Sequence, residues 1–112
     1  MKMRSNPDFF NGVPEMLVLH LISEGEKYGY ELVRLIRHRS KGRFSFGEGC
    51  IYPILHALTK TGALVSRAEI KEGRWRRYYR ITPKGRRKLT ALVREWRDVT
   101  SSVASALKTS PA

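Results

Sequence analysis

The chain has 112 residues, a formal net charge of +12 and a single cysteine, Cys50. This length suits one domain with a modest hydrophobic core. No apolar run approaches the roughly 18 residues of a membrane span, no signal-peptide pattern is present, and one cysteine cannot form an intramolecular disulfide. We therefore expect a basic cytoplasmic protein with no membrane partner.

The positive charge is concentrated in one part of the chain. Residues 34–94 carry 17 Lys and Arg against 3 Asp and Glu, whereas residues 1–33 carry 3 against 5 and residues 95–112 carry 2 against 2. A local excess of this kind is typical of a surface that binds a polyanion. Nucleic acid is therefore the expected partner.

The first third of the chain predicts two helices. Residues 1–12 are polar apart from Phe9 and Phe10 and are expected to form a mobile arm. Pro14 suits the first turn of a helix, and the apolar run after it predicts a helix covered on more than one side. A second helix is predicted from residues 28–30 to about Ser40, because its leucines and isoleucine recur at helical spacing.

A third helix is predicted from Glu48 to Thr61, with Pro53 in its first turn. Its buried face consists of Ile51, Leu55 and Leu58. The opposite face carries Gly49, Tyr52, Pro53, His56 and Lys60. A short helix that exposes small or hydrogen-bonding residues fits a DNA major groove. The alternative is an ordinary surface helix.

Residues 62–82 predict a β-hairpin around the turn Glu72-Gly73. Because side chains alternate along a strand, Tyr79 and Ile81 are expected in the core. The other face of the returning strand is expected to point outward as a row of guanidinium groups, which pair well with phosphate. It consists of Arg74, Arg76, Tyr78 and Arg80. The alternative is a solvated edge strand whose charge prevents aggregation.

A long final helix is predicted over residues 83–108, after an N-cap threonine and a first-turn proline at Thr82-Pro83. Its apolar positions are separated by alternating steps of three and four, as in a coiled coil. They are Leu89, Leu92, Trp96, Val99, Val103 and Ala106. We expect a dimerisation helix; the alternative is a helix folded back along its own domain.

The predicted order of three helices, a basic hairpin and a long helix indicates a winged helix-turn-helix protein. The fold class is α+β, mostly α, with a two-stranded wing and a long C-terminal dimerisation helix. The expected boundaries are a DNA-binding domain over residues 1–82, the dimerisation helix over 83–108 and a tail over 109–112.

Four stretches resemble the successive signatures of the PadR-like transcriptional regulators, in the short subgroup with a single C-terminal helix. They are YGYEL (28–32), GCIYPIL (49–55), GALV (62–65) and RRYYRITPKG (76–85). The resemblance implies a homodimer that binds palindromic promoter DNA, usually as a repressor.

By position, the resemblance assigns DNA contacts to three parts of the chain. Tyr30 would touch the phosphate backbone. The recognition helix would enter the groove at Gly49, Cys50 and Tyr52, with His56 and Lys60 further along its exposed side, and the wing would contribute Arg74, Arg76 and Arg77. Two residues depart from the family pattern: Cys50 replaces a hydroxyl residue, and Trp75 stands where a small, proline or basic residue is more usual.

Other chemistry finds little support. The three histidines are isolated in the sequence, so no metal site or cofactor is expected. No nucleotide-binding loop or nucleophile-base arrangement is present, which argues against an enzyme. Cys50 lies near a helix N-terminus in a cationic region, so redox sensing is a hypothesis, with a small apolar filler as the alternative.

Trp96 lies at the centre of the predicted dimer interface. With Phe10 it is a candidate site for a planar hydrophobic small molecule, as in some short PadR-like proteins, and core packing is the alternative. We therefore expect a sequence-specific repressor that is released by such a ligand. The alternatives are a non-specific architectural or RNA-binding protein, and an interaction module whose long helix pairs with another protein.

Overall fold

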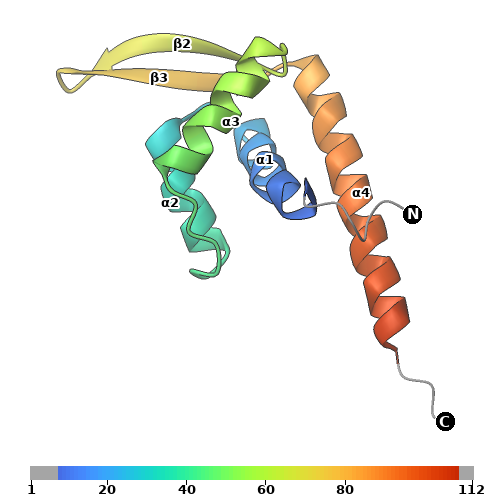
Figure 1. Cartoon of the computed structure of the whole chain (residues 1–112). Helices are drawn as coiled ribbons and strands as arrows, with labels where there is room; N and C mark the ends of the chain where they lie inside the picture. The colour runs from blue at the N-terminus through green and yellow to red at the C-terminus, as the bar shows by residue number, and fades with distance from the viewer. Residues whose placement is uncertain (1–7, 109–112) are drawn as a thin grey trace.

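The computed structural model describes the backbone of residues 8–108 and the side chains of residues 12–108. Along the chain it contains α1 (Asp8–Ser23), β1 (Lys27–Tyr28), α2 (Gly29–Arg39), α3 (Glu48–Lys60), β2 (Leu64–Lys71), β3 (Arg74–Ile81) and α4 (Pro83–Leu107). Figure 1 shows α1, α2 and α3 gathered beneath the base of the β2–β3 hairpin, with α4 on the opposite side from the hairpin tip. The predicted winged-helix order is confirmed.

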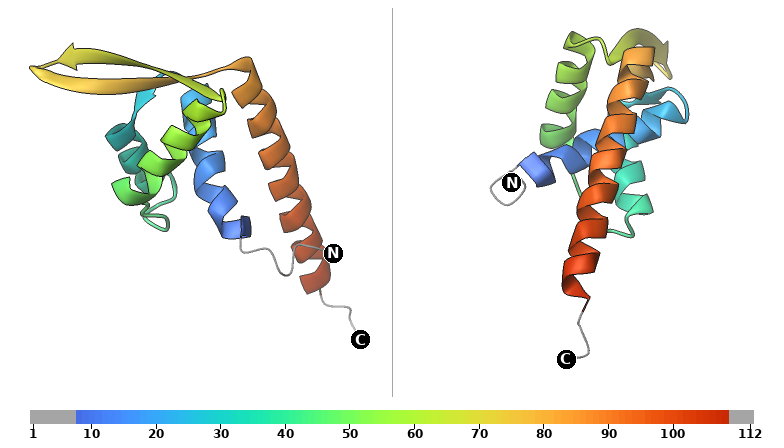
Figure 2. Two further views of the ribbon diagram at one scale, coloured as in Figure 1. Left: turned by 45° about the horizontal axis from the view of Figure 1, so that its top comes forward. Right: turned by 90° about the vertical axis from the view of Figure 1, so that its right-hand side faces the viewer.

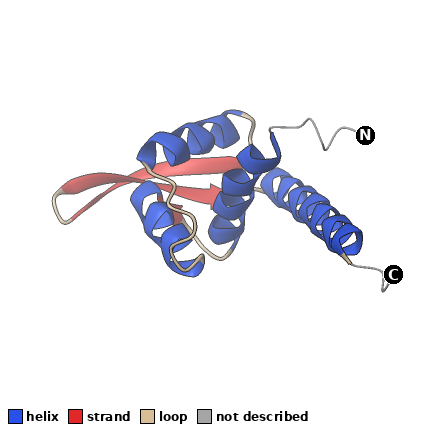
Figure 3. Ribbon diagram, turned by 60° about the horizontal axis from the view of Figure 1, so that its bottom comes forward, coloured by secondary structure: helices blue, strands red, loops and turns tan. Residues whose placement is uncertain are grey.

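The core lies where the first three helices meet the base of the hairpin. Its fully buried side chains are Val18, Leu19, Ile22, Leu32, Ile51, Leu55, Leu58 and Leu64. The hairpin adds Tyr79 and Ile81, which are 8% and 6% exposed, as predicted. The hairpin is therefore anchored at its base, and Figure 3 shows its tip extending beyond the helices.

The sheet has a third strand that the sequence analysis missed. Its order is β1-β3-β2, and both pairings are antiparallel. Lys27 lies opposite Tyr79, and Tyr28 lies opposite Tyr78. A strand of two residues is too short to show an alternating pattern, and its second residue is also the N-cap of α2. The prediction of a two-stranded hairpin holds for the tip, but its base has three strands.

Two predictions about prolines are wrong. The first helix begins at Asp8 and not near Pro14, so Pro14 is its seventh residue and the helix extends into the predicted arm. Pro53 is the sixth residue of α3 and does not lie in the first turn. Proline has no N–H, so each of these two prolines leaves the carbonyl four residues earlier without its usual helical hydrogen bond. For Pro53 that carbonyl belongs to Gly49. Both prolines lie in the N-terminal half of their helix, near an end where backbone groups commonly lack intrahelical partners.

The hairpin is joined to α4 by a closely packed junction. The Thr82 hydroxyl caps α4 by accepting a hydrogen bond from the Gly85 N–H at 3.1 Å, and the Thr82 N–H donates to the Ala63 carbonyl at 3.0 Å. Gly85 is buried, and a Cβ there would overlap the Ala63 carbonyl oxygen. Only glycine therefore allows α4 to start this close to β2.

The two ends of α4 have different surroundings. Leu89 and Leu92 pack against the core of their own domain, and Lys88 forms an ion pair with Glu15 at 3.6 Å. Towards the C-terminus, Val103 and Leu107 are 48% and 73% exposed. In Figure 2 this end of α4 extends past the helical body. The first part of the predicted interface thus folds back along its own domain, and the last part does not.

Candidate nucleic-acid interface

The exposed side of α3 carries most of the predicted groove-reading residues. Gly49, Tyr52, His56 and Lys60 are all exposed, whereas Cys50 is half-buried in the first turn. The buried side holds Ile51, Leu55 and Leu58, as predicted. The structure therefore divides α3 into a core face and a solvent face with the expected residues on each.

Tyr52 is held in place by its neighbours. Its ring lies against Gly29 at the start of α2, so closely that a Cβ on Gly29 would overlap it. Partial burial, with the charge of Glu48 and the nearby Tyr79 adding to it, raises the pKa of Tyr52 above its ordinary value. The hydroxyl, protonated at neutral pH as in any ordinary tyrosine, can both donate and accept a hydrogen bond. The ring is still 42% exposed.

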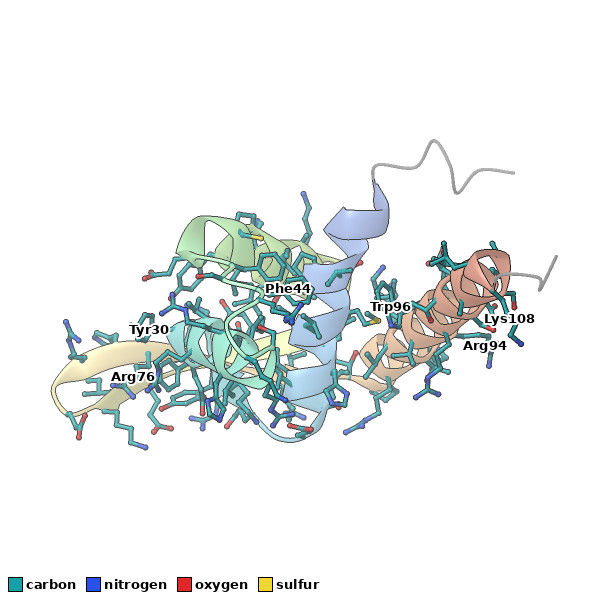
Figure 4. All side chains as sticks on the ribbon, turned by 90° about the horizontal axis from the view of Figure 1, so that it is seen from below. Tyr30, Phe44, Arg76, Arg94, Trp96 and Lys108 are labelled. Carbon is teal, nitrogen blue, oxygen red and sulfur yellow. The ribbon has the colours of Figure 1, made fainter. Side chains whose placement is uncertain are left out.

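Tyr30 extends the same surface onto α2. Its side chain is 50% exposed, and the Arg34 guanidinium lies over its ring, 5.5 Å from the centroid. Figure 4 shows Tyr30 where α2 meets the hairpin. Arg34 was not among the contacts predicted from the sequence, although a separation of four residues on a helix brings it beside Tyr30.

The hairpin has two faces, defined by the strand register. The inner face contains Trp75, Arg77, Tyr79 and Ile81 of β3 opposite Ile70, Ala68, Ser66 and Leu64 of β2. The outer face contains Arg74, Arg76, Tyr78 and Arg80 of β3 opposite Lys71, Glu69, Arg67 and Val65 of β2. At its base the inner face is covered by α1 and α3.

The outer face is not the free row of guanidinium groups that the sequence predicted. Tyr28 of β1 packs edge-on against Tyr78 with ring centroids 5.6 Å apart. The Arg76 guanidinium stacks over Tyr28 at 4.5 Å, and the Arg67 guanidinium stacks over Tyr78 at 4.9 Å. The prediction was wrong for Arg76 and Tyr78 because the missed strand β1 supplies the aromatic ring that half-buries them.

Carboxylates complete this outer-face stack. Arg67 donates to both carboxylate oxygens of Glu26, at 2.7 and 2.9 Å, and also pairs with Glu69. The hydrogen bond from Arg67 lowers the pKa of Glu26, and the two carboxylates raise the pKa of Arg67. Arg67 is thus fully engaged within the protein and is a poor candidate for a phosphate contact.

On the inner face, the side chains between Tyr79 and the tip of the hairpin have few partners within the protein. Arg77 donates one hydrogen bond to the Ser66 hydroxyl at 3.1 Å, and Trp75 is 70% exposed. On the outer face at the tip, Arg74 forms no ion pair with any residue in the described part of the chain. Glu72 and Gly73 close the tip with φ of 54° and 76°, as in a type I′ turn. Arg74 and Arg77 are therefore better placed to bind phosphate than Arg67 and Arg76.

The predicted dimerisation residues divide into two groups. Leu89, Leu92 and Val99 are covered by other residues of the same chain, with Val99 only 7% exposed. Trp96 and Val103 retain exposed area of 36% and 48%. Figure 4 shows Trp96 on the side of α4 turned towards α1 and Arg94 on the opposite side. The Phe10 side chain, the other candidate ligand contact, lies outside the described residues.

Two structural features are absent from the described part of the chain. No helix within residues 8–108 is long and apolar enough to cross a bilayer. Among the same residues, no three His, Cys, Asp or Glu side chains come together as a metal-binding group.

Comparison with known proteins assigns the family. The model of the "Transcriptional regulator PadR-like family" matches residues 18–91. Transcriptional regulator Rv3488 of Mycobacterium tuberculosis is 35% identical over 83 residues, which cover 74% of this chain and 75% of that protein. A transcriptional regulator from Clostridium thermocellum has a structure with a TM-score of 0.82 at 28% identity, covering 92% of this chain and 98% of that one.

The fold is also similar to that of Bacillus subtilis PadR in complex with operator DNA. The TM-score is 0.65 at 23% identity, and the match covers 89% of this chain and 50% of that one. The matched proteins with an assigned role are regulators and not enzymes. The chain is a member of the PadR-like family of transcriptional regulators.

Proposed function

We propose that this protein is a homodimeric repressor that binds a palindromic operator through α3 and the tip of the β2–β3 hairpin. The observation that carries the proposal is the exposed side of α3, which lies in a segment with 17 basic and 3 acidic residues. The operator complex of Bacillus subtilis PadR, which has the same fold, supports DNA as the partner. Since the partner is chromosomal DNA, the proposed location is the cytoplasm.

In this proposal α3 enters the major groove with Gly49 and Tyr52 leading and with His56 and Lys60 along the groove. The Gly49 carbonyl has no helical donor because Pro53 lacks an N–H. The Pro53 ring lies over that carbonyl, so Gly49 contributes through its lack of a side chain, which lets the helix approach the bases closely. Cys50 is half-buried at the same helix end and presents only a weak donor.

The phosphate contacts come from residues around that helix. Tyr30 offers a hydroxyl beside the Arg34 guanidinium, and Arg74 and Arg77 offer guanidinium groups on the wing. Arg76 is assigned mainly to wing rigidity, because its guanidinium is stacked on Tyr28 and its side chain is only 26% exposed. With four phosphates neutralised per protomer, the log–log salt slope of the dimer is expected near −7, at about 0.9 per phosphate.

The dimer forms through α4 in this proposal. Trp96, Val103 and Leu107 keep exposed apolar area on a helix whose end extends past the helical body. Pairing two such helices buries that area and relates the two α3 helices by a two-fold axis. The α3 helices of such a dimer lie about 34–36 Å apart, one turn of DNA. A planar hydrophobic molecule bound at Trp96 between the α4 helices would change their angle and lower operator affinity.

The test is selection of bound sites from a random duplex library at about 150 mM salt, where weak non-specific binding is partly suppressed. We expect an inverted repeat with half-site centres about 10 bp apart and a preference over competitor DNA of about 10³ or more. The Arg77→Ala variant should bind the same repeat more weakly. Retained protein with an unenriched library would overturn the repressor proposal in favour of a non-specific DNA- or RNA-binding protein.

A further inference from the structure

The tip of the hairpin exposes two large apolar side chains that lie opposite each other. Trp75 is 70% exposed and Ile70 is 57% exposed, and the two are directly paired across the strands. A paired tryptophan and isoleucine with this much exposed area is unusual on a charged hairpin, because an exposed apolar patch is informative where an isolated exposed leucine is not. Neither residue contributes to the core.

This pair lies on the inner face of the hairpin. Trp75 and Ile70 share that face with Tyr79, which is buried beneath α1 and α3. They therefore point to the same side of the sheet as the recognition helix, but beyond the edge of the helices, where the tip projects alone (Figure 3). Arg77 lies between Trp75 and Tyr79 on this face, so cationic and apolar groups alternate along it.

The surroundings of the pair decide what it can bind. Lys71 and Arg74 flank it at the turn, both are exposed, and Arg77 follows on the inner face. Of these cations only Arg77 shares the inner face with the pair, while Lys71 and Arg74 project from the outer face of the same tip. A neutral apolar protein surface gains nothing from such neighbouring cations. Duplex DNA offers both requirements within a few ångströms, since phosphates line each groove and the deoxyribose rings that form the walls of the minor groove are apolar.

The rest of the hairpin keeps the pair in position. The outer-face stack of Tyr28, Tyr78, Arg76 and Arg67 ties the middle of the hairpin to β1 and to Glu26. A tip on a stiff arm loses little conformational freedom when it binds, which favours a defined contact. From these observations we infer that Trp75 and Ile70 form an apolar wedge that enters the DNA minor groove beside the site of α3 and packs against sugars and base edges.

The inference rests on the proposed function and adds to it a contact that does not depend on charge. Apolar wedges in the minor groove favour base steps that open easily, such as TA and CA. The wedge therefore gives the protein a preference for flexible steps in the DNA flanking the half-site, in addition to the bases that α3 reads.

The experiment compares Trp75→Ala with the wild type and with two controls. Val65→Ala removes an exposed apolar side chain from the outer face of the same hairpin, and Arg77→Ala removes a cation from the inner face. Trp75→Ala should weaken binding to duplex DNA by about 10-fold, since burial of a large apolar side chain is worth that order of affinity. Its salt slope should equal that of the wild type, because no phosphate contact is removed. Val65→Ala should bind like the wild type, and Arg77→Ala should show a smaller slope.

Fluorescence reports the contact directly. The protein contains only two tryptophans, Trp75 and Trp96, so the difference between the wild type and Trp75→Phe isolates the emission of Trp75. Saturating duplex should quench that emission and leave the Trp75→Phe spectrum unchanged. Unchanged Trp75 emission at saturation, or wild-type affinity of a folded Trp75→Ala, would overturn the wedge.

Failure of the wedge and failure of the operator proposal give different results. A protein that binds all duplexes equally but shows Trp75 quenching has the wedge without the operator specificity. A protein that prefers a selected operator but shows no quenching has the specificity without the wedge. Absence of binding to any duplex at low salt overturns both.

Discussion

The two faces of the β2–β3 hairpin use their arginines in opposite ways. On the outer face, Arg67 and Arg76 are stacked on tyrosine rings, and Arg67 is also paired with two carboxylates. On the inner face, Arg77 makes one hydrogen bond to a serine hydroxyl, and its neighbour Trp75 is largely exposed. The middle of the outer face stabilises the arm, whereas the inner face and Arg74 at the tip are available to a partner.

This difference shows that the number of arginines on a strand does not measure its capacity to bind DNA. The outer face has more arginines than the inner one, yet the short strand β1 brings Tyr28 over two of its side chains. A stacked guanidinium is held rigidly and partly dehydrated. The contribution of each arginine to DNA binding therefore depends on the surface opposite it, and four experiments examine that dependence.

The largest effect on stability is expected at Gly85, because this residue lies in the junction that joins the whole hairpin to α4. A Cβ at this position would overlap the Ala63 carbonyl oxygen and lie close to the Ile81 side chain. Relief requires α4 to move away from the hairpin, so Gly85→Ala should lower the free energy of unfolding by about 3 kcal/mol, in the upper range for overpacking. Urea denaturation measures this change.

Gly49→Ala is the matched control, because a Cβ there meets no atom within 4 Å. In an exposed helical position this change should raise stability by about 0.5–1 kcal/mol. Equal effects of the two substitutions would show that the α4 junction is not tightly packed.

The second effect distinguishes the two faces by DNA binding. Arg77→Ala should weaken operator binding by about tenfold and reduce the salt slope of a dimer by nearly 2, since each protomer loses one phosphate contact at about 0.9. Arg76→Ala should change the slope less and should lower the free energy of unfolding, because it removes a guanidinium that is stacked on Tyr28. Titration at several salt concentrations gives the slopes. A larger slope change for Arg76→Ala would reverse the assignment of the faces.

The third effect is confined to the outer face. Tyr78→Leu keeps an apolar side chain but loses the edge-on contact with Tyr28 and the stacked Arg67. We expect a loss of about 1–2 kcal/mol in the free energy of unfolding from the aromatic and cation–π contacts together. The salt slope of DNA binding should be unchanged. A reduced slope without a stability change would mean that this face contacts phosphate directly.

The features predicted correctly from the sequence are those that periodic patterns, turn residues and helix caps determine. Helical spacing predicted the buried faces of α2 and α3, the turn at Glu72-Gly73 placed the hairpin, and Thr82-Pro83 marked the start of α4. The separation of exposed and buried residues on α3 followed from the same spacing. These features depend on interactions within one element, so they are visible in one stretch of sequence.

The remaining features depend on contacts between distant residues. Strand β1 has two residues and is defined only by pairing with β3, and the stack on the outer face follows from that pairing. The ion pair of Arg67 with Glu26 joins residues 41 apart in the sequence. The part of α4 that its own domain covers depends likewise on how closely the helix lies against the core. No local pattern marks such contacts, so they required the structure.

The smallest effect concerns the ion pair that ties the outer face to the loop before β1. The hydrogen bond from Arg67 lowers the pKa of Glu26 below its ordinary value of 4.5. A carboxylate with a lowered pKa in the folded state stabilises the protein above its unfolded-state pKa, and that contribution is lost as the pH falls through the folded-state value. Wild type should therefore be slightly more stable than Glu26→Gln at neutral pH, and the difference should shrink as the pH falls below the ordinary glutamate pKa of 4.5.

Glu24→Gln provides the control for this last prediction. Glu24 pairs with Arg39 on the helical body, away from the hairpin, and its pKa is lowered in the same way. Both variants should show the same dependence of unfolding on pH in urea denaturation. Only Glu26→Gln should weaken DNA binding at neutral pH, because only that ion pair holds the wing. Equal DNA affinity of the two variants would mean that the aromatic stack alone fixes the wing and that its ion pairs contribute only to stability.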